Sequence, residues 1–65
     1  MDKDTNKVIK AAVKQGFTAT ATTKGHPVCI APNGERCVTS GTPGDRRALR
    51  NFIACLRRNG FRWPA

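Results

Sequence analysis

The sequence has no long apolar run. No stretch of its 65 residues approaches the roughly 20 consecutive apolar residues that a transmembrane helix needs. The first residues, Met1-Asp2-Lys3-Asp4, also lack the apolar segment of a secretory signal peptide. We therefore expect a cytoplasmic protein without a membrane partner.

Acidic residues are scarce, which limits the catalytic mechanisms open to the chain. Metal-dependent nucleases use clustered carboxylates, but Asp2 and Asp4 are terminal. The other two acids, Glu35 and Asp45, fall in a predicted turn and a predicted helix cap. No Ser-His-Asp arrangement and no glycine-rich phosphate loop is recognisable either. We expect no metal and no other cofactor.

Cysteine occurs three times, at Cys29, Cys37 and Cys55, and histidine once. An odd number of widely spaced cysteines matches neither a disulfide framework nor the close cysteine pairs of a zinc ribbon. We expect free thiols that are buried or half-buried. A mixed zinc site of two cysteines and the histidine is the alternative.

Positive charge is in excess. Twelve Lys and Arg against four Asp and Glu give a formal net charge of +8, more than solubility alone requires of so short a chain. Polyanions such as RNA, or DNA, are the natural partners. Residues 1–65 are expected to form one domain whose small core leaves no room for a deep substrate cavity. A functional site should therefore lie on an open face.

The first amphipathic segment predicts a helix over residues 5–15. Its apolar residues share one sector of a helical wheel and its lysines the other, and Gly16 can end the helix in a left-handed conformation. Residues 17–24 then alternate small apolar and Thr residues, with the period of two that is typical of a strand.

Asn33-Gly34 predicts a hairpin, because this pair between two strand-like runs is the strongest short-range hairpin signal. With a two-residue turn, Ile30 would pair with Cys37, and Cys29 with the residue after it. Cys29 and Cys37 would then face opposite sides of the sheet and could not bond. A longer loop would change this register.

A second helix is predicted after Ser40-Gly41, with Thr42 as its N-cap, Pro43 as its first helical residue and Asp45 completing the cap. It should run to about Asn59. The fold is therefore expected to be α+β with the order α-β-β-β-α. Short connections favour a three-stranded antiparallel sheet with both helices packed on one face.

The second helix carries the firmest functional signal. Its apolar residues occupy one arc, and an adjoining arc holds five arginines: Arg46, Arg47, Arg50, Arg57 and Arg58. Arginine contacts phosphate in a bidentate manner that does not depend on base identity. A solvated face would mix acids with bases, and this segment contains no acid. A membrane-surface helix is less favoured, because the core needs the apolar arc.

His26 is the catalytic candidate, although a lone histidine is more often structural or merely exposed. It follows Lys24-Gly25, where glycine lets a ligand backbone approach and lysine adds positive charge. Metal-free RNA cleavage needs only a base and cations, because the 2′-hydroxyl of RNA supplies the nucleophile. Lys24 joins the arginines as a predicted nucleic-acid contact. For Phe61 and Trp63, packing on the core edge is favoured over base stacking.

The order of elements and several motifs together resemble the HicA family of small toxin ribonucleases. The motifs are Gly16-Phe17, Lys24-Gly25-His26, Asn33-Gly34, Gly41-Thr42 and the segment 56–61. The resemblance implies a double-stranded-RNA-binding-like fold, cleavage of messenger RNA with His26 as catalytic residue, and neutralisation by a cognate antitoxin protein.

One departure from that family concerns the catalytic residue itself. The family usually has Gly-Ser-His, whereas here Gly25 is followed directly by His26 and Pro27. The alternative function is a non-catalytic nucleic-acid-binding accessory protein of a phage or mobile element. A module that binds an acidic protein partner is a third hypothesis.

Overall fold

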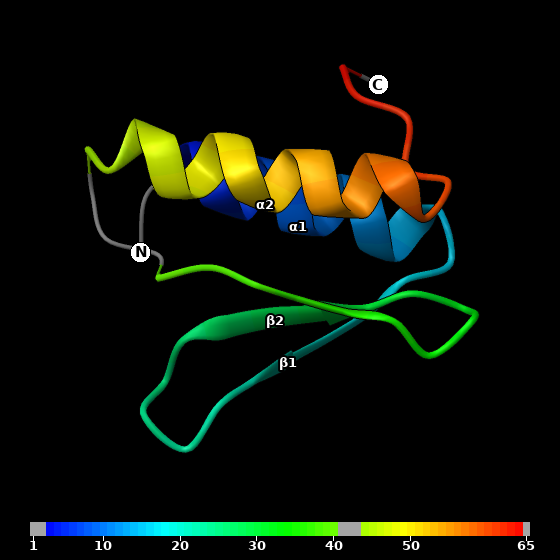
Figure 1. Cartoon of the computed structure of the whole chain (residues 1–65), viewed down its shortest axis with the longest axis horizontal. Coiled ribbons are helices and arrows are strands. Elements are labelled where there is room, and N and C mark those ends of the chain that lie inside the picture. Colours follow the sequence, from blue (N-terminus) through cyan, green and yellow to red (C-terminus); the bar gives the residue numbers. More distant parts are fainter. Residues whose placement is uncertain (1–2, 41–43, 65) are drawn as a thin grey trace.

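Two helices and three strands make up the chain in the predicted order. The computed structural model describes residues 3–40 and 44–64 (Figure 1). The elements are α1 (Lys3–Lys14), β1 (Thr18–Ala21), β2 (Pro27–Ile30), β3 (Arg36–Val38) and α2 (Arg46–Arg58). The sheet is antiparallel with the order β1-β2-β3. The predicted α+β fold is confirmed.

Both helices lie side by side on one face of the sheet and run in the same direction (Figure 1). This layering follows from the two amphipathic patterns, because each helix has one apolar stripe to bury. No helix among residues 3–40 and 44–64 has the length and apolar character required to cross a membrane.

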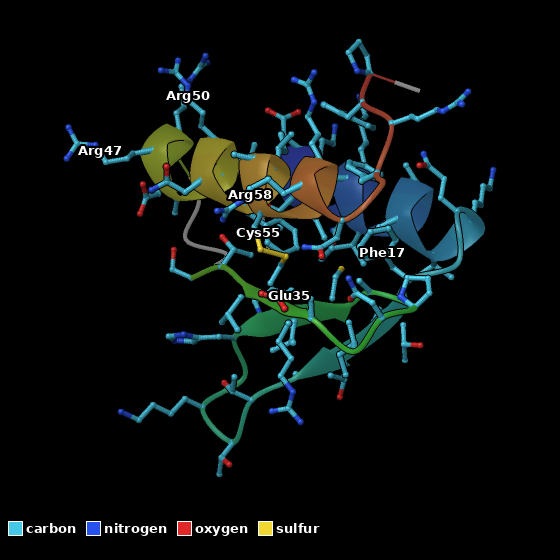
Figure 2. The ribbon with its side chains drawn as sticks, turned by 45° about the vertical axis from the view of Figure 1, so that its right-hand side comes forward. Phe17, Glu35, Arg47, Arg50, Cys55 and Arg58 are labelled. Atoms are coloured by element: carbon cyan, nitrogen blue, oxygen red, sulfur yellow. A yellow bond between two sulfur atoms is a disulfide. The ribbon has the colours of Figure 1, made fainter. Side chains whose placement is uncertain are left out.

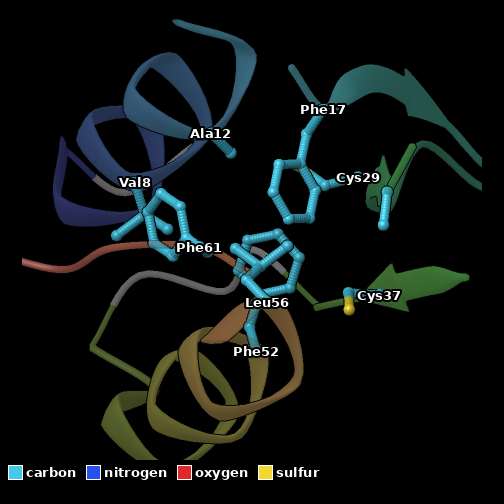
Figure 3. Packing of buried hydrophobic residues seen from close by; sticks show 9 residues of the cluster. Val8, Ala12, Phe17, Cys29, Cys37, Phe52, Leu56 and Phe61 are labelled. Atoms are coloured by element: carbon cyan, nitrogen blue, oxygen red, sulfur yellow. The ribbon is translucent and has the colours of Figure 1, made fainter. Parts of the chain in front are cut away.

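The core lies between the helices and the sheet (Figure 3). Its buried side chains come from both helices, from β2 and β3, and from the segments that flank them: Val8, Ala12, Phe17, Cys29, Ala31, Cys37, Phe52, Leu56 and Phe61. The Phe61 ring meets the Phe17 ring edge-on at 6.0 Å, which ties the C-terminal tail to the start of the sheet. Phe61 therefore packs as predicted.

The β1–β2 loop shortens the first strand relative to the predicted range 17–24. The Thr22 N–H donates to the His26 carbonyl at 2.9 Å, and the Gly25 N–H donates to the Thr22 carbonyl at 2.8 Å. Gly25 has a φ of +86°, a conformation that residues with a side chain rarely adopt. The hairpin therefore closes over Thr22–His26, and β1 ends at Ala21.

The predicted two-residue turn at Asn33-Gly34 is wrong. Cys29 pairs with Cys37, because the loop has three residues, 32–34. The residue that closes it opposite Glu35 is Ala31, whose N–H donates to the Glu35 carbonyl at 2.8 Å. The Asn33 side chain favours this longer loop. Its Oδ1 accepts from the Glu35 N–H at 2.9 Å, and its Nδ2 donates to Asn59 at the end of α2 at 3.1 Å.

The start of α2 also differs from the prediction. Asp45 is the N-cap, and its Oδ1 accepts from the Ala48 N–H at 3.0 Å, so the helix begins at Arg46. Thr42 and Pro43, predicted to start the helix, lie outside the described residues. The C-cap is Asn59, in agreement with the predicted end.

A disulfide joins Cys37 of β3 to Cys55 of α2, with 5.9 Å between the Cα atoms (Figure 2). The prediction of three free thiols is therefore wrong for two of them. The reason is the register: pairing Cys29 with Cys37 places both on the face that the helices cover. Cys29 remains free and buried.

Reducing this disulfide should lower the free energy of unfolding by about 3 kcal/mol, because an opened link restores chain entropy to the unfolded state. Urea denaturation with and without dithiothreitol measures the difference. The double variant Cys37→Ala/Cys55→Ala is the control and should not respond to the reductant. Equal midpoints for the wild type in both conditions would contradict the link.

Candidate nucleic-acid interface

All five predicted arginines on α2 are exposed, but they form two separate rows. Successive helical residues are rotated by about 100°, so Arg46, Arg50 and Arg57 fall within a sector of about 40°. We call these three the arginine row. Arg47 and Arg58 lie roughly 100° further around the helix. Figure 2 shows Arg50 extending from α2 on the side away from the sheet, whereas Arg47 extends sideways from the start of the helix.

The arginine row borders a groove of about 480 Å³, which we call the arginine groove. Leu49, Ile53 and Ala54 supply its apolar floor, and Asp4 and Gly44 complete its lining. Leu49 and Ile53 belong to the predicted apolar arc but are only half-buried. On the helical wheel Ile53 borders the arginine row and Leu49 is the next apolar residue inward, which is the sequence signal for this floor.

The charge of the groove favours an anion. Among the described residues that line it there are three guanidinium groups and one carboxylate, that of Asp4. At 1.5 Å per helical residue, the row from Arg46 to Arg57 extends about 16 Å along α2. That length matches several successive phosphates of one strand, which are spaced by about 3.4 Å along a duplex axis. The apolar floor can accept the sugars between them.

His26 and Lys24 lie in the β1–β2 loop and are exposed. The His26 N–H donates to the Thr22 hydroxyl at 3.1 Å, and its carbonyl accepts from the Thr22 N–H. These two bonds fix the backbone of His26 while its imidazole stays open to solvent. The histidine is thus held at a defined place on the surface.

The structure brings the predicted site residues together only in part. Figures 1 and 2 show the β1–β2 loop and the start of α2 at the same end of the molecule, one in the sheet layer and one in the helix layer. Lys24 and His26 therefore share this end with Arg46 and Arg47. Lys24 and His26 do not line the arginine groove. Arg57 and Arg58 lie at the other end of α2.

Metal ligands do not cluster in the part of the chain that the structure describes. No group of three or more His, Cys, Asp and Glu side chains comes together there in a way that could hold an ion. The alternative of a zinc site on two cysteines and His26 is not supported, because Cys37 and Cys55 are consumed by the disulfide.

Comparison with known proteins adds no assignment. No protein-family model, no curated protein and no solved structure matches this chain. A function for the chain is therefore inferred from its exposed basic side chains and its sequence motifs.

Cys29 is the remaining thiol, and its environment disfavours a nucleophilic role. It is fully buried beside Cys37, and burial raises the pKa of the Cys29 thiol above its ordinary value. At a given pH, a smaller fraction of the Cys29 thiol is therefore in the reactive thiolate form than for an exposed cysteine.

We expect Cys29 to resist iodoacetamide in the folded protein at neutral pH and to react rapidly in urea. Mass spectrometry of the quenched reaction counts the added groups. Because the folded-state pKa is raised, this thiol contributes stability at neutral pH that is lost as the pH rises past its ordinary pKa. Rapid labelling under native conditions would contradict the buried placement.

Proposed function

We propose that the chain binds the phosphate backbone of nucleic acid through the arginine groove. The observation that carries this proposal is the alignment of Arg46, Arg50 and Arg57, all exposed, on one side of a single helix above an apolar floor. Guanidinium groups pair with phosphate oxygens in a bidentate manner and do not read bases. Binding should therefore depend weakly on sequence and strongly on salt.

Two other polyanionic surfaces fit the groove less well. A membrane-surface helix needs a free apolar face, but Phe52 and Leu56 of α2 are buried in the core. An acidic protein partner would match the charge, but guanidinium groups in line along one side of a helix favour a ligand with repeating negative charge. RNA is the preferred polymer, because the HicA resemblance implies it.

Changing Arg46, Arg50 and Arg57 together to Gln should weaken binding across sequences. It should also reduce the slope of log affinity against log salt, by up to about 2.7 on B-form DNA and about 2.1 on single strands. Fluorescence anisotropy of labelled strands over a salt series gives both quantities.

The matched control removes the same three charges elsewhere, by changing Arg36, Arg47 and Arg58 to Gln. These side chains are also exposed and do not line the groove. We expect a smaller loss of slope for this control. An equal loss in both variants would indicate a response to net charge and would refute a localised groove.

A more specific proposal is that bound RNA is cleaved, with His26 as the base. The exposed imidazole on a fixed loop, next to Gly25 and Lys24, favours it. His26 would accept the proton of a 2′-hydroxyl, whose oxygen attacks the adjacent phosphorus to form a 2′,3′-cyclic phosphate, while the 5′-oxygen of the next nucleotide leaves and takes a proton from water. A strand would have to extend from the start of α2 to the β1–β2 loop. The alternative of a non-catalytic accessory protein needs no such path.

His26→Ala should abolish RNA cleavage and leave RNA affinity within about twofold, because a base is lost and no phosphate contact is. Gel analysis of end-labelled RNA in EDTA measures cleavage, and a 2′-deoxy substitution at the cut nucleotide should stop it. Lys3→Gln serves as the control and should retain cutting, because it removes one exposed charge on α1 outside the arginine groove and the β1–β2 loop. Cleavage that survives His26→Ala or requires magnesium would defeat this mechanism, and the non-catalytic alternative predicts none from either protein.

The toxin assignment carries two further expectations. A cognate antitoxin would neutralise the protein by covering the face that binds RNA, and the protein would act in the cytoplasm. The Cys37–Cys55 bond argues against a cytoplasmic location, because disulfides persist mainly in oxidising compartments. The thiol content of the protein isolated from cells therefore tests the proposed location.

A further inference from the structure

A second groove, of about 390 Å³, lies where α1 meets the C-terminal tail, and we call it the lysine–tryptophan groove. Its lining shares no residue with the arginine groove and consists of Lys7, Lys10, Ala11, Lys14, Gln15 and Trp63. The described residues that line it supply three ammonium groups and no carboxylate. Positive charge and one aromatic ring therefore meet in a single hollow.

The lysines reach this groove because of their spacing along α1. Lys7, Lys10 and Lys14 follow one another by three and four residues, which aligns them on one side of a helix. All three are exposed. The opposite side of α1 buries Val8 and Ala12 in the core, so the lysine side must face solvent.

Gln15 fastens the tail beside these lysines. Its Oε1 accepts from the Arg62 N–H at 2.7 Å, and its Nε2 donates to the Arg62 carbonyl at 3.0 Å. The side-chain amide thus pairs with the backbone of Arg62 as one strand pairs with another. This pairing holds Trp63, the next residue, against the end of α1.

Trp63 is placed as a platform and not as a core residue. Its ring stacks on Phe61 with centroids 5.8 Å apart and planes inclined by 13°. Phe61 is only 4% exposed and already fills the core edge, whereas Trp63 is half-buried and lines the groove. The sequence favoured packing for both aromatics, but the structure gives Trp63 this second surface.

We propose that the lysine–tryptophan groove binds single-stranded nucleic acid, with an unpaired base stacked on Trp63 and neighbouring phosphates on Lys7, Lys10 and Lys14. Stacking on an aromatic side chain combined with cations along the backbone is how single strands are held without sequence preference. A duplex fits poorly, because its bases are already stacked on one another.

A lipid surface is the other polyanion that lysines and tryptophan can contact. It requires a broad apolar helix face that can enter the bilayer, but Val8 and Ala12 of α1 are buried in the core and Val13 is the large apolar side chain of this helix that is exposed. Charge and an aromatic ring without such a face favour the single strand. This proposal does not depend on the arginine groove.

The test uses the fact that Trp63 is the only tryptophan of the chain. Titration with a short oligo(dT) strand should quench its fluorescence in a saturable and salt-sensitive manner. A duplex of equal length should quench weakly, and inorganic phosphate should not quench at all. Absence of quenching by the single strand would overturn the proposal, as would a larger emission change with phosphatidylserine vesicles than with oligo(dT).

Three variants locate the contact. Trp63→Leu keeps an apolar group on Phe61. Made in the Arg46, Arg50 and Arg57 to Gln background, so that the arginine groove does not contribute, it should weaken oligo(dT) binding, measured by anisotropy of the labelled strand, by about 5-fold to about 150-fold. Changing Lys7, Lys10 and Lys14 to Gln should abolish the quenching, whereas the Arg46, Arg50 and Arg57 to Gln variant should retain it.

Unchanged affinity in Trp63→Leu, or quenching that persists in the lysine variant, would refute the groove. Circular dichroism confirms the fold of each variant, and the wild-type titration stands without any of them. Loss of quenching in the arginine variant alone would also count against this proposal. If the arginine variant keeps the quenching and its salt slope on duplex DNA equals that of the wild type, the result would instead count against the arginine groove.

Discussion

The packing of α2 on the sheet is the contact on which the surface of this protein depends. Phe52 and Leu56 are buried almost completely, and the disulfide from Cys55 to Cys37 joins the same helix to β3. Together they fix the rotation of α2 about its axis. A rotation by one residue, about 100°, toward the apolar side of the helix would carry the arginine row into the core, where unpaired guanidinium groups are strongly disfavoured.

The same logic applies to α1, with a different outcome at its end. Val8 and Ala12 turn toward the core, which leaves the lysine side outward. Directly after the end of α1, the side chain of Gln15 pairs with the backbone of Arg62 in the C-terminal tail. Two amphipathic helices laid side by side thus give two basic grooves, one with an aliphatic floor and one with an indole.

Much of the architecture could be predicted from periodicity, since both helices, the antiparallel strands and the arginine arc follow from local patterns. The predictions of the hairpin register and of the cysteine pairing were wrong because they depend on loop geometry. Asn33 uses its side chain to hold the Glu35 N–H and Asn59, which lengthens the loop and shifts the register by one residue. That shift places Cys37 on the face of the sheet that the helices cover. Without the correct register, the disulfide to Cys55 could not be predicted. The relation between His26 and the arginines depends on how two layers stack, which no local pattern encodes.

The link between Cys37 and Cys55 also gives the chain a closed ring of covalent bonds, with 18 positions of sequence separating its two cysteines. The first part of α2, with Arg46, Arg47 and Arg50, belongs to that ring, whereas Arg57 and Arg58 lie outside it. A protease that cuts one peptide bond within the ring therefore leaves both fragments attached, and they separate only after reduction. A cut between the ring and α1 leaves no covalent bond between a lysine-bearing piece and an arginine-bearing piece, so these separate on unfolding without any reductant.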